Sequence, residues 1–131
     1  MQIHQSAEDY LETILMLSQR MGKVRSIDVV NELGFTKASV SIAMKKLREN
    51  GYIAVDGEGN LTLLEPGREI AERIYSRHRL LTHFFVQLGV DEEVAAEDAC
   101  KAEHILSEQT LEKIREYALF HDAQDLSLIH I

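Results

Sequence analysis

A change in apolar spacing at Gly51 is the feature that most constrains the fold of this chain. Before it, residues 26–50 hold two short stretches of helical spacing, joined by a turn that contains Gly34 and followed by Thr36 as a helix cap. After it, residues 52–55 and 61–64 have an extended pattern and flank a loop rich in Asp and Gly. This order predicts a helix-turn-helix followed by a β-hairpin wing.

Helical spacing recurs in the rest of the chain and predicts further helices over residues 6–21, 66–88 and 91–106, and from residue 107 onward. The expected caps are Ser6, Ser26, Asp91 and Ser107. Residues 120–131 show no clear period. The predicted fold class is therefore mainly α, with a winged helix-turn-helix over residues 1–65 and a helical domain over residues 66–131.

Composition excludes several classes of protein. With 131 residues, 45% of them apolar and 27% charged, the chain fits one ordinary globular domain or two small ones. No apolar run is long enough to cross a bilayer and no cationic-then-apolar leader is present, so we expect a cytoplasmic protein without a membrane partner. The single cysteine, Cys100, cannot form an internal disulfide.

The charge distribution indicates a nucleic-acid partner despite a net charge of −8. The segment from Arg20 to Arg48 is locally +5, and it contains the second helix of the predicted pair. In that helix Val40, Met44 and Leu47 would face inward, leaving polar and basic side chains outward. The predicted DNA-binding residues are Arg25, Thr36, Lys37, Ser39, Ser41, Lys45, Lys46 and Arg48. The alternative is that these charges only solvate a helix surface.

A possible metal site is indicated by Cys100, Glu103 and His104, which stand at helical spacing i, i+3 and i+4. One helix face would then present a thiolate, a carboxylate and an imidazole, a mixture that suits divalent transition metals. The alternative is a buried cysteine beside a solvated glutamate and histidine.

Three other residues add to this donor set. Asp9 and Glu12 offer two carboxylates on one face of the first helix. His78 is a polar residue of the long helix that stands between core-facing positions, and its imidazole is a further possible ligand. Their alternatives are a helix cap, a solvated face and a core histidine, respectively.

Three segments of the sequence resemble the metal-binding stretches of the diphtheria toxin repressor family, especially its short manganese transport regulator branch. They are SAEDYLETI at residues 6–14, RHRLL at 77–81 and DACKAEHILS at 98–107, and the resemblance covers about residues 6–118. It implies a homodimeric, metal-activated repressor of metal-uptake genes, with Mn(II) or Fe(II) as cofactor and double-stranded operator DNA as partner. The metal ligands that it implies are Asp9, Glu12, His78, Cys100, Glu103 and His104.

The resemblance is a hybrid of two branches. Asp9 and Glu12 are typical of the manganese branch, whereas Cys100 is typical of the iron branch, where a thiolate favours softer ions such as Fe(II), Co(II) or Zn(II). The iron branch's ancillary site is not expected, because its ligand positions are Thr82 and Ala96 here, although His83 is a candidate to compensate in part.

Other functions are less well supported by the sequence. It has no HExxH motif and no nucleophile with an evident paired base, so we expect no enzymatic activity and no small organic substrate. The alternative function is a winged-helix regulator that senses a different metal (Zn or Co) or an organic ligand. Although apolar residues at helical spacing are more often plain core, the candidate dimer-interface residues are Phe84, Phe85, Leu88, Val90 and Val94.

Overall fold

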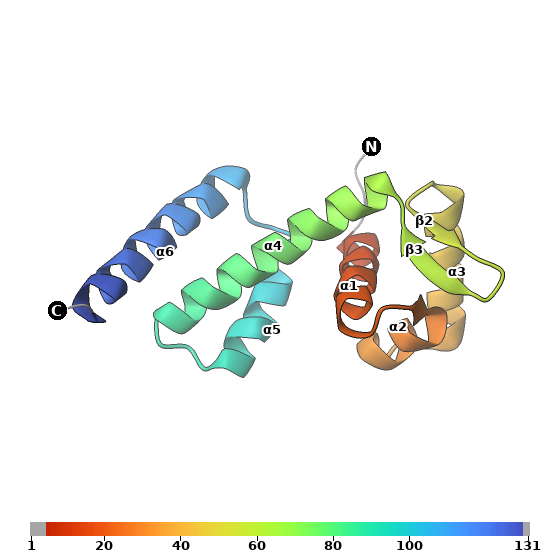
Figure 1. Ribbon diagram of the computed structural model, residues 1–131, viewed down its shortest axis with the longest axis horizontal. Coiled ribbons are helices and arrows are strands. Elements are labelled where there is room, and N and C mark those ends of the chain that lie inside the picture. The colour runs from red at the N-terminus through yellow and green to blue at the C-terminus, as the bar shows by residue number, and fades with distance from the viewer. Residues whose placement is uncertain (1–4, 130–131) are drawn as a thin grey trace. The chain divides into compact units, whose positions relative to one another are not determined.

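The computed structural model describes residues 5–129, with side chains described for residues 5–123. The elements follow one another as α1 (Gln5–Met21), β1 (Val24–Arg25), α2 (Ser26–Leu33), α3 (Lys37–Glu49), β2 (Ile53–Val55), β3 (Asn60–Leu63), α4 (Glu65–Gln87), α5 (Glu92–Ala102) and α6 (Glu108–Ile129) (Figure 1). They form two compact units, Met1–Ile74 and Tyr75–Ile131, and α4 contributes to both. The predicted mainly helical class is confirmed.

The first unit contains the predicted wing. Strands β2 and β3 pair antiparallel, with Ile53 opposite Leu63 and Val55 opposite Leu61. A third strand, β1, pairs with the other edge of β3, so the sheet order is β1-β3-β2. The sequence did not predict β1, because two residues are too few to show an alternating pattern.

The wing turn is held by one carboxylate. Asp56 Oδ1 accepts hydrogen bonds from the backbone N–H groups of Glu58 and Asn60, each at 2.9 Å. Asp56 Oδ2 accepts a third from Asn60 Nδ2 at 3.0 Å. These bonds, the Asn60 amide first among them, lower the pKa of Asp56, because they favour the ionised carboxylate.

The core of the first unit confirms the predicted inner face of α3. Val40, Met44 and Leu47 are buried together with Leu11 of α1 and Ile53 of β2. Burial of such side chains contributes about 1.5–3 kcal/mol each, so this apolar face anchors α3 and leaves the opposite face exposed.

Helix starts follow the sequence only in part. Thr36 Oγ1 accepts from the Ser39 N–H at 3.1 Å, so the predicted cap of α3 is confirmed. Ser26 was wrong as a cap, because it is the first helical residue of α2 and Arg25 precedes it; the Arg25 N–H donates to Asp28 Oδ2 at 2.9 Å. Ser6 was also wrong, because it lies inside α1.

The second unit packs the C-terminal half of α4 against α5 and α6. Its buried core is formed by Leu81, Ala99 and Leu111, one from each helix. Helix α5 begins after Asp91 as predicted but ends at Ala102, short of the predicted 106.

Helix α6 begins where the sequence predicted and extends further than its apolar pattern indicated. Ser107 Oγ accepts from the Thr110 N–H at 3.2 Å, which confirms the predicted start. The helix then continues to Ile129, across residues that showed no period, in a stretch free of Gly and Pro. None of the helices described here is both long and apolar enough to cross a membrane.

Candidate functional site

A buried carboxylate lies between two imidazoles in the second unit. Glu103 is 0% exposed; its Oε2 lies 3.0 Å from His78 Nδ1, and its Oε1 lies 3.4 Å from His104 Nε2. His78 comes from α4, whereas Glu103 and His104 follow α5. The structure therefore gathers three residues of the predicted metal-binding set around one carboxyl group.

The local backbone differs from the expected continuous helix face. Because α5 ends at Ala102, Glu103 and His104 lie in the turn that follows it rather than on a helix. The turn keeps a helical hydrogen bond, from the Glu103 N–H to the Ala99 carbonyl at 2.9 Å. This bond keeps Glu103 one turn beyond the buried Ala99, so the carboxylate points into the unit.

Arg77 of α4 fixes this turn from the other side. Its Nη1 donates to the main-chain carbonyl of Glu103 at 3.2 Å, and its Nη2 forms an ion pair with Glu108 at the start of α6. The Arg77 side chain is 15% exposed. Sequence reasoning missed Arg77, because a contact between residues 26 positions apart has no local pattern.

The donor set fits a divalent transition metal. Among the residues described, the buried Glu103 Oε1 accepts no hydrogen bond, and its contact with His104 Nε2 is long at 3.4 Å. A buried carboxylate is costly unless a cation compensates it. Ligand atoms of Cys100 and Glu103 lie within 4.8 Å of each other, as do those of His78 and Glu103. Imidazole, carboxylate and thiolate together suit Mn(II), Fe(II) and the softer ions that follow them.

The two remaining predicted ligands belong to the first unit. Asp9 and Glu12 lie on α1, one turn apart, with Glu12 buried and Asp9 partly so. Burial raises the pKa of the neighbouring Tyr10, and the Asp9 carboxylate raises it further. The six predicted ligands are thus divided between the units, with four in the second and two in the first.

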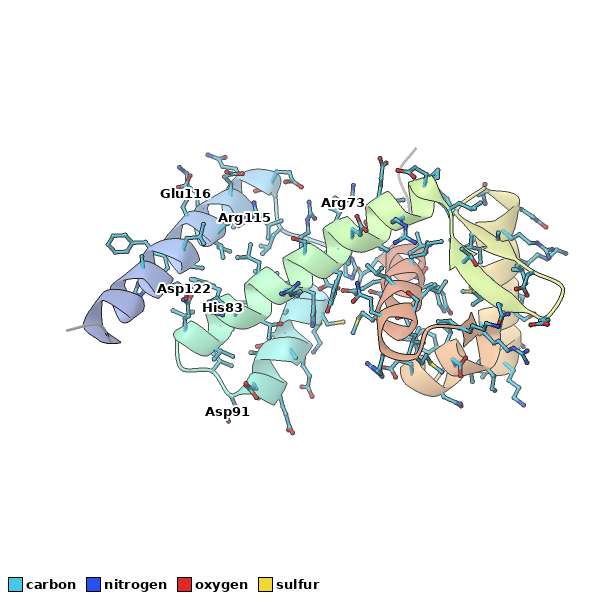
Figure 2. All side chains as sticks on the ribbon, viewed as in Figure 1. Arg73, His83, Asp91, Arg115, Glu116 and Asp122 are labelled. Atoms are coloured by element: carbon cyan, nitrogen blue, oxygen red, sulfur yellow. The ribbon has the colours of Figure 1, made fainter. Side chains whose placement is uncertain are left out.

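His83, the candidate for a partial ancillary site, has another partner in the structure. Its Nε2 lies 3.0 Å from Asp122 Oδ1, so that α4 and α6 face each other through these two side chains (Figure 2). Gln87 Nε2 donates to the same carboxylate oxygen at 2.8 Å.

Two of the candidate dimer-interface residues are exposed, while another packs against the core. Leu88 and Val94 are exposed, whereas Phe85 packs against the buried cluster of the second unit. Phe85 is only partly buried, so it contributes to packing within the second unit without being a fully buried core residue.

The predicted DNA-binding residues all lie on the exposed surface of the first unit, and they are Arg25, Thr36, Lys37, Ser39, Ser41, Lys45, Lys46 and Arg48. A hollow of about 250 Å³ is lined by Ser26 of α2, Ser41, Lys45 and Arg48 of α3, and Val55 of β2. Hydroxyl groups and cations around one hollow suit phosphate oxygens.

The first unit is a winged helix-turn-helix with an exposed basic helix, and the second is a helical unit with a buried carboxylate between imidazoles. Together these features define a class of protein, the metal-responsive DNA-binding regulators. Two family descriptions match in the same order. "Iron dependent repressor, N-terminal DNA binding domain" matches residues 2–61, and "Iron dependent repressor, metal binding and dimerisation domain" matches residues 64–124. The chain belongs to the iron-dependent repressor family, which confirms the resemblance found in its motifs.

Individual relatives agree with this assignment. The chain is 36% identical to an HTH-type transcriptional regulator of Methanocaldococcus jannaschii over 85% of its own length and 90% of the relative's. It is 32% identical to the transcriptional regulator MntR of Bacillus subtilis, over 92% and 84%. A solved manganese-dependent transcriptional repressor in complex with manganese superposes with a TM-score of 0.79 at 29% identity, over 87% of this chain and 53% of that one. The chain thus spans about half the length of that solved structure.

Proposed function

We propose that this protein represses metal-uptake genes by binding operator DNA when Mn(II) or Fe(II) occupies a site formed by Asp9, Glu12, His78, Cys100, Glu103 and His104. The observation that carries the proposal is the fully buried Glu103 carboxylate, which lies between two imidazoles inside a domain of the metal-binding and dimerisation type. A cation supplies the positive charge that this group needs in a buried position.

The proposed roles divide along the chain. Residues 1–65 bind DNA, and residues 66–131 bind metal and form the dimer; this division is supported by the matched ranges 2–61 and 64–124. The family belongs to the transcriptional regulators, so we propose no catalytic activity and no small organic substrate. As a regulator of genes, the protein would act in the cytoplasm.

The mechanism we propose is thermodynamic linkage. Asp9 and Glu12 belong to the unit that carries α3, and the other four ligands belong to the second unit. Ligands from both units on one ion restrict the orientation of the DNA-binding unit, and in a homodimer they restrict two copies of α3 at once. Metal and operator DNA then stabilise the same conformation, so each raises the affinity for the other.

Cys100 bears on the choice of metal. A thiolate is a softer ligand than a carboxylate and moves the preference from Mn(II) toward Fe(II), Co(II) and Zn(II). Asp9 and Glu12 are hard ligands that act in the opposite direction. The proposed site therefore accepts both Mn(II) and Fe(II), with the cysteine setting their order.

The test is DNA binding with and without EDTA, followed by titration with Mn(II), Fe(II), Co(II) and Zn(II), against a duplex selected by the protein from a randomised library. We expect metal to be required and Glu103→Gln to abolish the metal response. Glu116→Gln is the matched control, because it removes an exposed carboxylate of α6 that pairs only with Lys113 among the described contacts. DNA binding that is indifferent to EDTA would instead support a regulator that senses an organic ligand.

The role of the basic helix is tested separately. Replacing Lys45 and Lys46 with alanine should weaken binding to every sequence and lower the slope of log K against log salt by about 0.9 for each lost phosphate contact. An unchanged slope would show that these lysines only solvate the helix.

A further inference from the structure

The exposed face of α3 has an apolar residue at its centre. Ile42 is 58% exposed, whereas Val40 and Met44, two residues before and after it in α3, are buried in the core. At about 100° per residue, Ile42 lies about 160° from each of these buried residues, which is almost opposite the core-facing side. No other side chain larger than alanine on this face is apolar, since Lys45 and Lys46 follow at i+3 and i+4 and Ala38 precedes at i−4.

The position of Ile42 matters more than its exposure. Single exposed apolar residues are common on protein surfaces and need no explanation. Here, however, the isoleucine lies on the outer face of α3 and in its N-terminal half, the half from which a helix-turn-helix protein contacts base edges in the major groove. Isoleucine is also β-branched and a weaker helix former than the straight-chain residues, so helix stability does not favour it there.

Its side chain can contact only one kind of group on the edges of the bases. The major groove presents hydrogen-bond donors and acceptors from every base pair, and its one apolar group is the C5-methyl of thymine. An isoleucine carries no donor or acceptor, so opposite a guanine, cytosine or adenine edge it would displace water without replacing its hydrogen bonds.

We propose that Ile42 is a specificity-determining residue that contacts the C5-methyl group of a thymine in each operator half-site. Ser39 and Ser41 precede Ile42 at i−3 and i−1 and flank it around the helix axis, where their hydroxyl groups can bond to polar base edges or phosphates. Lys45 and Lys46 neutralise phosphates. The inference deepens the proposed function and rests on it. It predicts that each half-site contains a thymine whose methyl group, and not merely its pairing, is read.

The experiment replaces thymine by deoxyuridine, which removes the methyl group and leaves the base pair intact. A duplex is selected from a randomised library with the wild-type protein and Mn(II), and each thymine is then replaced singly. Wild-type binding should weaken about fourfold at one thymine per half-site, the value for one buried methyl-sized group of about 0.8 kcal/mol. Ile42→Ala should bind the thymine and deoxyuridine duplexes equally at that position.

The matched control is Ile27→Ala, which truncates an isoleucine that is 43% exposed on α2, and it should keep the wild-type ratio. The inference is overturned if Ile42→Ala keeps the full penalty for deoxyuridine, or if no thymine is sensitive to loss of its methyl group. Either result leaves metal-dependent binding in place and the proposed function standing. Failure of the wild-type protein to bind any duplex with Mn(II) or Fe(II) overturns both.

Discussion

Replacing Arg77 with methionine removes the contact that holds the Glu103 turn while keeping a long, partly buried side chain. The lost hydrogen bond joins a charged donor to the Glu103 carbonyl at 3.2 Å, and such bonds contribute about 1.5–3 kcal/mol. The ion pair with Glu108, which is 81% exposed, adds only about 0–1 kcal/mol. If the turn must be ordered to bind metal, affinity should fall about 10- to 100-fold, the range seen when groups that orient ligands are removed.

The assay is Mn(II) binding followed by the electron paramagnetic resonance of the free ion. Glu108→Gln should change the affinity less than about fivefold, since it removes only the exposed partner. Arg79→Met is a second control, because Arg79 also lies on α4 but stacks over the Tyr75 ring. Wild-type affinity in a folded Arg77→Met protein would refute the assignment of Arg77 as a positioning residue.

Three further predictions test other parts of the molecule. If Cys100 is a ligand, Co(II) should produce a sulfur-to-metal charge-transfer band that Cys100→Ser abolishes, and Cys100→Glu should make Mn(II) more effective than before, relative to Co(II), in activating DNA binding. An unchanged spectrum and an unchanged ranking of the metals would show that the cysteine is not a ligand. Gly67→Ala should destabilise the first unit by about 1–3 kcal/mol in urea unfolding, because a Cβ there would lie 2.2 Å from the Tyr52 carbonyl oxygen, whereas Gly57→Ala, with open space around it, should not. The fold lowers the pKa of Asp56, so its ionised carboxylate stabilises the wing turn fully above the ordinary pKa of 3.8, and this stabilisation is lost as pH falls through the lower folded pKa. The NMR resonance of the Asn60 amide should therefore titrate with a midpoint below pH 3.8, and a midpoint at or above 3.8 would contradict this.

Features that depend on neighbouring residues could be predicted well. Thr36 caps α3 through a bond to Ser39, only three positions along, and the hairpin closes over the four residues 56–59, one fewer than the predicted loop because Asn60 already belongs to β3. The alternation of buried and exposed positions in α3 follows from the helical period alone. Each of these features is decided by the chain within a few residues, so the sequence pattern reveals it.

The errors occurred where a tertiary contact competes with a local preference. Ser26 is a good capping residue, yet the pairing of β1 with β3 holds Arg25 in extended backbone and moves the cap to Arg25. The spacing of Cys100 and His104 fits one helix face, yet α5 ends between them, where Arg77 binds the Glu103 carbonyl.

The sequence by itself determined the order of helices and strands, the basic outer face of α3 and the residue types that suit a transition metal, because each is encoded by local spacing and side-chain chemistry. Only the tertiary structure decided that Glu103 is fully buried between His78 and His104, and that Arg77 fixes its backbone. Burial and the contacts between α4 and the turn after α5 arise from packing between segments about 25 residues apart, and no periodicity within either segment encodes them.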